Sequence, residues 1–449
     1  PSLGVIEGVE KILKVNNIHP SKLKHIIHGT TLVANAIIER RGSKVALITT
    51  QGFRDIQEIG TELRYDTYDL FMEMPVPLVT RRWRYEVSER IRADGQIITA
   101  LDESSVVEVA RAIASSDVDA VAVSLLHSYQ NPAHERRIRE ILKQEAPNAI
   151  VCISSDVMPE IGEYERTSTT ICNAYVLPTF TRYLARLTRR FHEMGIDKEL
   201  YLMLSDGGTV HESTAAIYPI RLVQSGPAGG VQAAAAINKV VADGDSQGDI
   251  LCFDMGGTTA KACLVEDGNP MHANEFEVAR IFRGKKGSGI PLKIPVIDMI
   301  EIGAGGGSIA HLDNLDLIQV GPQSASADPG PACYGLGGLG ATVTDADLIL
   351  GYLAADNFLG GDMQLDIEAS KAAVKNTIAD PLGLSIVDAA WAIHETVNES
   401  MAQAAAIHAL EKAKRITDYT MIPIGGAGPV HACNIALKLN LSKIVCPPG

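Results

Sequence analysis

One short stretch of the sequence combines residue types that suit phosphate chemistry. Two apolar, strand-like runs flank a turn with a carboxylate, two glycines, two hydroxyls and an amine, namely Asp254, Gly256, Gly257, Thr258, Thr259 and Lys261. Adjacent glycines let backbone N–H groups approach a phosphate closely, because no Cβ stands in the way. The hydroxyls and the amine can donate to phosphate oxygens, and the carboxylate can hold Mg²⁺ through water. The stretch predicts a phosphate-binding hairpin, with a plain β-hairpin as the alternative.

A second glycine-rich turn follows the apolar run that ends at Ile424, and its glycines are Gly425, Gly426 and Gly428. Pro429 stands where a following helix would have its first residue. Such a helix would aim its free N–H groups and its dipole at whatever fills the turn. Because α/β folds assemble sites from separate loops at one sheet edge, we expect this turn to lie near Asp254. A tight strand-to-helix connection without a ligand is the alternative.

Three further features are weaker candidates. Gly305 and Gly306 follow a strand-like run and could support a phosphate or a ribose, although a flexible surface loop has the same composition. His28 begins the segment His-Gly-Thr-Thr and could serve as a general base. The alternative is that the segment is an ordinary helix N-cap formed by Thr30 or Thr31. Glu165 and Arg166 lie either on a plain helix face or toward a substrate, which makes Glu165 a second candidate base.

The elements that must position these residues alternate between strands and helices. Residues 105–154 read as helix, buried strand, helix, buried strand, a pattern typical of a parallel sheet. Two long helical periodicities cover about residues 164–194, interrupted at Pro178, and about residues 387–410. The polar segment 238–248 reads as a loop at a domain boundary. The sequence therefore predicts an α/β protein.

Composition narrows the function classes. The 449 residues allow about two or three domains. With 54 acidic and 40 basic residues the net charge is −14, which argues against partners such as nucleic acid or an anionic membrane. Seven cysteines without a C-x-x-C pair predict neither a disulfide framework nor a zinc site. No apolar run reaches the roughly 18 residues of a membrane span, so we expect a cytoplasmic protein.

Several catalytic motifs are absent or misplaced. The sequence contains no P-loop and no G-x-S-x-G elbow, so any nucleotide must be held by another architecture. Gly335, Gly337 and Gly340 match a dinucleotide fingerprint, but a proline-rich loop precedes them where a strand is required. His394-Glu395 has no second histidine four residues on, which excludes a zinc-protease helix.

The order of these motifs resembles a known group of proteins. A strand–Asp–Gly-Gly-Thr hairpin with a later Gly-Gly-Ala-Gly turn resembles the sugar-kinase/actin/chaperone ATPase superfamily. Within it, the match is to the hydantoinase A/5-oxoprolinase family, the A-type subunits of ATP-dependent hydantoinases. The resemblance covers nearly the whole chain and is carried in order by HGTT, TTQGFRDIQEIG, SGPAGGV, DMGGTTAK, EIGAGGGSIA, ADPGPACYG, TVTDADL and IGGAGPVHA.

The resemblance implies two ribonuclease-H-like halves with the nucleotide in a cleft between them, divided here as 1–195 and 196–449. It implies that the Asp254 hairpin is the second phosphate motif and that the Gly425 turn seats adenosine. Family members carry a further Asp-x-Gly-Gly-Thr hairpin ahead of the region that begins at Pro1, and they continue past Gly449. We therefore expect the sequence to be truncated at both ends and to lack its first phosphate hairpin.

The implied activity is ATP-driven opening of a cyclic amide of the hydantoin or 5-oxoproline type. Phosphorylation would turn the amide carbonyl oxygen into a leaving group, with ATP and Mg²⁺ as cofactors and Asp254 as the metal ligand. A B-type partner subunit, a homo-oligomer, or both are implied. Two alternatives stay open, namely an ATP-dependent acetone or acetophenone carboxylase subunit and a nucleotide-binding regulatory subunit without chemistry of its own.

Overall fold

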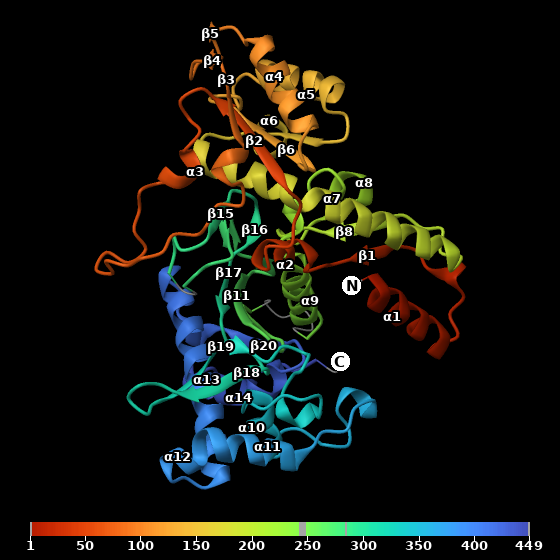
Figure 1. Ribbon diagram of the computed structural model, residues 1–449. Coiled ribbons are helices and arrows are strands. Elements are labelled where there is room, and N and C mark those ends of the chain that lie inside the picture. Colours follow the sequence, from red (N-terminus) through yellow and green to blue (C-terminus); the bar gives the residue numbers. More distant parts are fainter. Residues whose placement is uncertain (1, 242–247, 283–284, 448–449) are drawn as a thin grey trace. The chain divides into compact units, whose positions relative to one another are not determined.

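The computed structural model describes residues 2–241, 248–282 and 285–447 (Figure 1). The chain forms two compact units, one of Pro1–Gly229 with His272–Val296 and the other of Gly230–Met271 with Ile297–Gly449. Both mix helices and strands, as the alternation in the sequence predicts. Helix α9 (Ser225–Val241) includes the start of the predicted boundary loop, and residues 242–247 of that loop lie outside the described residues.

The first unit contains a fully parallel four-stranded sheet. Its strand order is β3 (Arg84–Val87), β2 (Val45–Thr50), β6 (Ala120–Ser124) and β7 (Ile150–Ile153). All three pairings are parallel. All residues of β2 and β6 are buried, as expected for strands covered on both faces, and β6 is the first of the two buried strands predicted within residues 105–154. The predicted parallel sheet is confirmed, but the second strand predicted as buried is β7, which lies at the edge of the sheet with Ile150 exposed.

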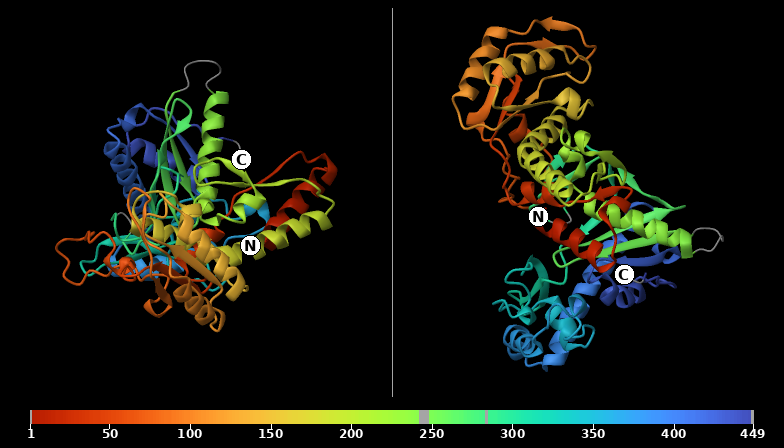
Figure 2. Two further views of the ribbon diagram at one scale, coloured as in Figure 1. Left: turned by 90° about the horizontal axis from the view of Figure 1, so that it is seen from above. Right: turned by 90° about the vertical axis from the view of Figure 1, so that its right-hand side faces the viewer.

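Helices cover both faces of this sheet. Helices α4 (Glu103–Ala114) and α5 (Ala133–Glu145) lie side by side on one face (Figures 1 and 2). Ala46 and Ile48 belong to the apolar cluster on that face, whereas Val45 and Leu47 belong to the cluster around α7 (Glu163–Glu193) on the other. This alternation follows from the two-residue period of a strand.

Helix α7 runs for 31 residues and continues through Pro178, contrary to the predicted interruption there. A proline in a helix interior removes one backbone hydrogen bond. The helix is buried along much of its length on both sides of Pro178, and that packing holds it together across the proline.

The second unit is built on a mixed sheet in the order β12 (Asn269–Pro270), β11, β10 and β20, with β17 (Met299–Ile302) also paired to β11. Strands β10 (Ile250–Met255) and β11 (Ala260–Glu266) form the predicted antiparallel hairpin. Strand β20 (Thr420–Ile424) runs parallel to β10. Helices α13 (Ile386–Glu411) and α14 (Gly428–Lys438) pack on this sheet, with α10 (Val343–Ile349) against α13.

A buried carboxylate organises the loops around α10. Asp345 completes a capping box with Thr342, and it also accepts hydrogen bonds from the N–H groups of Ala332 and Cys333 and from the Ser370 hydroxyl. The motifs ADPGPACYG and TVTDADL, which are separate in sequence, are therefore one hydrogen-bonded unit. Because every donor around Asp345 is buried, the carboxylate is a structural requirement.

The remaining helices and strands of the first unit are α1 (Ser2–Val15), β1 (Ile26–His28), α2 (Leu32–Ile38), α3 (Ile56–Ile59), β4 (Arg90–Ile91), β5 (Ile97–Thr99), α6 (Ser154–Val157), β8 (Leu200–Met203), β9 (Thr209–His211), α8 (Glu212–Ala215), β13 (His272–Ala273), β14 (Phe276–Val278) and β15 (Ile290–Leu292). Those of the second are β12 (Asn269–Pro270), β18 (Ser308–Leu312), β19 (Ile318–Ser324), α11 (Ile367–Val374) and α12 (Asp380–Leu382), and β16 (Val296–Ile297) joins the two. Among the described helices, none is both long and apolar enough to cross a membrane.

Candidate functional site

The hairpin that carries Asp254 ends in a tight, accessible turn. Asp254 pairs with Lys261 in the register of β10 and β11. The Gly256 N–H donates to the Thr259 carbonyl oxygen at 3.1 Å and closes the turn. Gly257 and Thr258 at its tip are exposed, whereas both strands are largely buried. The two buried strands thus hold the backbone N–H groups of Gly257 and Thr258 and the Thr258 hydroxyl at the surface of this unit.

The Gly305 loop supports this turn from behind. The Gly306 N–H donates to the Gly256 carbonyl oxygen at 3.0 Å, and the Gly305 N–H donates to the Ser308 hydroxyl at 2.9 Å. A Cβ on Gly305 would lie 2.7 Å from the backbone of Thr258, so only glycine permits the approach. Both amides have protein acceptors, and a direct contact from Gly305 or Gly306 to a phosphate stays a prediction.

The Gly425 turn meets Asp254 at the same edge of the sheet. Strands β10 and β20 are parallel with Asp254 opposite Ile424, so the residues that follow each strand are neighbours. Gly425 has φ of +79°, and a Cβ there would lie 2.4 Å from the Met255 carbonyl oxygen and 2.5 Å from Asp254 Oδ1. Positions 171 residues apart are therefore in contact, as expected from the sheet-edge rule.

Helix α14 begins directly after this turn, at Gly428, with Pro429 in its first turn. The Ala427 N–H donates to the Met255 carbonyl oxygen at 3.0 Å and ties the start of the helix to the end of β10. Gly425 and Gly426 are exposed, whereas Gly428 is buried against β10 and β20. The first two can contact a ligand, and Gly428 permits the helix to pack.

The electrostatics around Asp254 suit a cation. Burial raises the pKa of the Asp254 carboxyl, and the charge of Lys261 opposes this shift. The Lys261 ammonium donates to the Thr259 hydroxyl at 2.8 Å and lies 3.7 Å from Glu301 Oε1, so its charge is shared. A divalent cation would offset the desolvation of Asp254. A single carboxylate fits Mg²⁺, which binds through one or two carboxylates and keeps several waters in its shell.

The two weaker base candidates lie in the first unit, on β1 and α7. His28 Nε2 lies 2.7 Å from the Tyr183 hydroxyl, and burial lowers the pKa of His28. Glu165 is half-buried in the first turn of α7. The neighbouring Arg166 is fully buried, and its guanidinium donates to the carbonyl oxygens of Leu125 and Glu160. Arg166 therefore holds the chain around α7 and does not face a substrate.

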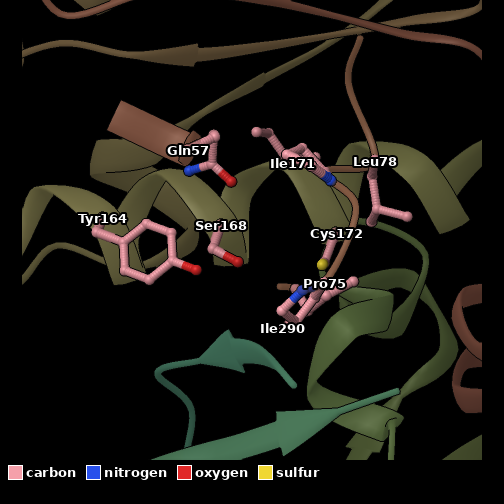
Figure 3. Close-up of a pocket in the computed structure, with 9 residues that line it drawn as sticks. Gln57, Pro75, Leu78, Tyr164, Ser168, Ile171, Cys172 and Ile290 are labelled. Atoms are coloured by element: carbon pink, nitrogen blue, oxygen red, sulfur yellow. The ribbon is translucent and has the colours of Figure 1, made fainter. Parts of the chain in front are cut away.

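A small cavity between α3 and α7 contains polar groups that the sequence analysis did not single out (Figure 3). The side chains of Gln57, Tyr164 and Ser168 line it, and Gln57 Nε2 and Ser168 Oγ have no hydrogen-bond partner among the described residues. Its volume of about 20 Å³ admits a water-sized group. Cys172 also lines it, but burial raises the pKa of that thiol to about 12, so it is no nucleophile.

Comparisons with known proteins agree with these features. A model of the hydantoinase/oxoprolinase family matches residues 166–449, and a model of the family's N-terminal region matches residues 1–146. An uncharacterized protein of Methanocaldococcus jannaschii is 41% identical over all of this chain and 65% of its own length.

Two solved structures are also similar. Nucleotide-free acetone carboxylase has a TM-score of 0.84 and 31% identity, over 99% of this chain and 63% of that one. The ATP-dependent caprolactamase of Pseudomonas jessenii has a TM-score of 0.79 and 33% identity, over 98% and 63%. The chain thus spans just under two thirds of the length of these relatives. The matches to both family models, in the order of the motifs, show that the chain belongs to the hydantoinase/oxoprolinase family.

Proposed function

We propose that this chain is the ATP-binding part of an ATP-dependent enzyme that opens a cyclic amide. The observation that carries the proposal is the contact between the Asp254 hairpin and the Gly425 turn at one sheet edge. It is supported by the similarity to a caprolactamase whose description names ATP dependence. The proposed fold is two ribonuclease-H-like halves, with 1–195 and 196–449 as their predicted division.

Each group at this edge has a role that follows from its chemistry. Asp254 would hold Mg²⁺, and the cation would neutralise charge on the phosphates. The exposed N–H group of Gly257, with Thr258, Thr259 and Lys261, would donate to phosphate oxygens, and Gly256 would keep the turn in shape because its N–H donates to the Thr259 carbonyl oxygen. The turn formed by Gly425, Gly426 and Gly428 would seat adenosine, because open space lies beside the backbone at Gly426. This chain thereby positions ATP and stabilises charge.

The proposed reaction begins with attack of the amide carbonyl oxygen on the γ-phosphorus, and the bond to the bridging oxygen breaks to release ADP. Water then adds to the activated carbon, and the carbon–nitrogen bond breaks as the nitrogen takes a proton. A second water releases phosphate and leaves a carboxylate. His28 and Glu165 are the candidate bases for these waters, and a B-type partner subunit or a second copy would complete the enzyme.

A second candidate is an ATP-dependent ketone carboxylase, which the similarity to acetone carboxylase favours. The two are distinguished by ATP turnover with hydantoin, 5-oxoproline or caprolactam, compared with acetone or acetophenone in bicarbonate. The first proposal predicts one ADP for each ring opened and no dependence on bicarbonate. Bicarbonate-dependent turnover with a ketone would contradict the cyclic-amide proposal and favour the carboxylase. ATP binding without turnover on any substrate would indicate a regulatory subunit.

The site itself is tested by Asp254→Ala, with ATP binding titrated in the presence of Mg²⁺. The matched control is Asp249→Ala, because Asp249 directly precedes β10 at the opposite end of the same strand. The proposal expects at least a tenfold loss of affinity and loss of turnover for Asp254→Ala alone. Equal affinity and equal turnover in both variants would remove Asp254 from the mechanism.

A further inference from the structure

Three helices of the second unit meet at a buried group of side chains that the proposed ATP site does not use. Asp347 lies on α10, His394 on α13 and His431 on α14. Their relative exposures are 2%, 0% and 0%. A carboxylate in such a place needs compensation for its lost hydration. Neighbouring groups must therefore supply hydrogen bonds or positive charge to Asp347.

The three side chains converge on one point. His394 Nδ1 lies 2.8 Å from Asp347 Oδ1, and His431 Nε2 lies 3.2 Å from Asp347 Oδ2. One potential ligand atom from each residue lies within 4.8 Å of the others. Around a tetrahedral Zn²⁺ with bonds of about 2.0–2.1 Å, neighbouring ligand atoms are about 3.3 Å apart. The 3.2 Å between His431 Nε2 and Asp347 Oδ2 is close to that spacing, whereas the 2.8 Å between His394 Nδ1 and Asp347 Oδ1 is a hydrogen-bond distance that metal binding would lengthen.

The hydrogen bonds of His431 indicate which of its nitrogens carries the proton. His431 Nδ1 lies 2.8 Å from Asn398 Oδ1, an acceptor, so Nδ1 carries the hydrogen. In the neutral ring, Nε2 then has a lone pair, and this lone pair faces the Asp347 carboxylate. The Nε2 atom has no hydrogen-bond partner among the described residues, because its contact with Asp347 lacks hydrogen-bond geometry. A lone pair opposite a carboxylate is repulsive unless a positive charge lies between them.

The surroundings of the group resemble the outer shell of a metal centre. The Asn434 amide lies 2.9 Å from His394 Nε2, and Asn398 bonds His431 on the far side from Asp347. A ligating histidine usually donates its second ring N–H to an acceptor, as His431 Nδ1 does to Asn398 Oδ1; for His394 to ligate through Nδ1, the Asn434 side chain would turn its amide oxygen, in place of its nitrogen, toward Nε2. The rings of Tyr352 and Trp391 stack on His394 with centroids 4.9 and 5.7 Å away, which restricts it further.

We propose that Asp347, His394 and His431 bind one divalent first-row transition-metal cation of the Zn²⁺ type. Two imidazoles and a carboxylate are donors that such cations accept. The sequence predicts no zinc site, because it contains no C-x-x-C pair and no second histidine four residues after His394. Here each ligand comes from a different helix, so no local spacing reveals the site. The cation joins α10, α13 and the first turn of α14.

The test uses the full chain, stripped with a chelator and then titrated with Zn²⁺ or Co²⁺. We expect one equivalent per chain by elemental analysis, visible d–d absorption with Co²⁺, and a higher unfolding temperature with Zn²⁺. His431→Gln and His394→Gln should each weaken binding at least tenfold. The matched control is His408→Gln, since His408 is a buried histidine on the same helix α13 but lies outside the cluster.

A second measurement, fluorescence quenching in the wild type, does not require the histidine variants to fold. Trp391 and Trp83 are the two tryptophans of the chain, and Trp391 stacks on His394. Co²⁺ at the proposed site should quench part of the wild-type fluorescence, and Trp391→Phe should abolish that part. No stoichiometric metal, no thermal shift and no quenching in the wild type would overturn the proposal and leave a metal-free hydrogen-bonded triad.

Discussion

Replacing Gly425 with alanine should destabilise the second unit far more than the same change one residue later. Gly425 has φ of +79°, and an added Cβ would lie 2.4 Å from the Met255 carbonyl oxygen. At Gly426 nothing lies within 4 Å of an added Cβ, and no positive φ is found. Both glycines are exposed in the same turn, so Gly426→Ala is a matched control.

The expected magnitude has two parts. The left-handed conformation costs an alanine about 1–2 kcal/mol. Overpacking against a rigid backbone adds about 1–3 kcal/mol, because the carbonyl cannot rotate away as a side chain would. The total is about 2–5 kcal/mol, and a loss of 3 kcal/mol corresponds to a fall of about 6–12 °C in Tm for a domain of this size. The same Cβ would lie 2.5 Å from Asp254 Oδ1, so the carboxylate must also move.

The assay is thermal and urea unfolding of both variants beside the wild type, followed by an ATP titration in Mg²⁺. We expect Gly425→Ala to lose stability and, if the proposed function holds, ATP affinity as well. Gly426→Ala should stay within about 1 kcal/mol of the wild type. Equal stabilities of the two variants would refute the derived contact between the Gly425 turn and β10. Unequal stabilities with unchanged ATP affinity would refute only the adenosine role.

Three more predictions follow from buried polar groups. Asp254→Asn should raise the free energy of unfolding at pH 7 while it removes turnover, because burial raises the pKa of Asp254 and its ionised form is disfavoured in the folded state. This gain in stability should shrink as the pH falls through the raised pKa. A constant gain in urea unfolding from pH 7 to pH 4 would contradict the prediction. Asp345→Ala should cost at least about 3 kcal/mol by urea unfolding, since several buried donors lose their acceptor, whereas the exposed N-cap variant Asp366→Ala should cost about 1 kcal/mol. Tyr183→Phe should cost about 1–3 kcal/mol by leaving His28 Nε2 without its 2.7 Å partner, and an unchanged Tm would argue against that bond.

The local elements of this protein are encoded by short patterns. The apolar run at β6 predicted a fully buried strand, because strands covered on both faces lack polar alternation. The β10–β11 hairpin was predicted from the Gly-Gly turn between two apolar runs. At Pro178 local propensity misled the prediction, because the tertiary packing of α7 outweighs the loss of one backbone hydrogen bond.

The role of the glycine clusters can be predicted only in part from the local sequence. The sequence marked Gly305 and Gly425 as positions where a backbone approaches something closely. What they approach is decided by the fold, namely Thr258 in one case and Met255 with Asp254 in the other. No pattern within one loop contains the identity of a neighbour that arrives from 50 or 170 residues away.

By itself, then, the sequence determined the α/β class, the hairpin at Asp254, the glycine turn after β20 and, through the order of its motifs, the family. The burial of Arg166, the joining of two distant loops by Asp345, and the convergence of Asp347, His394 and His431 depend on how the helices and loops pack in three dimensions. The difference arises from the distance along the chain over which each kind of interaction acts. Backbone propensity and periodicity act over a few residues, whereas the burial and partners of a charged side chain depend on which helices pack against each other.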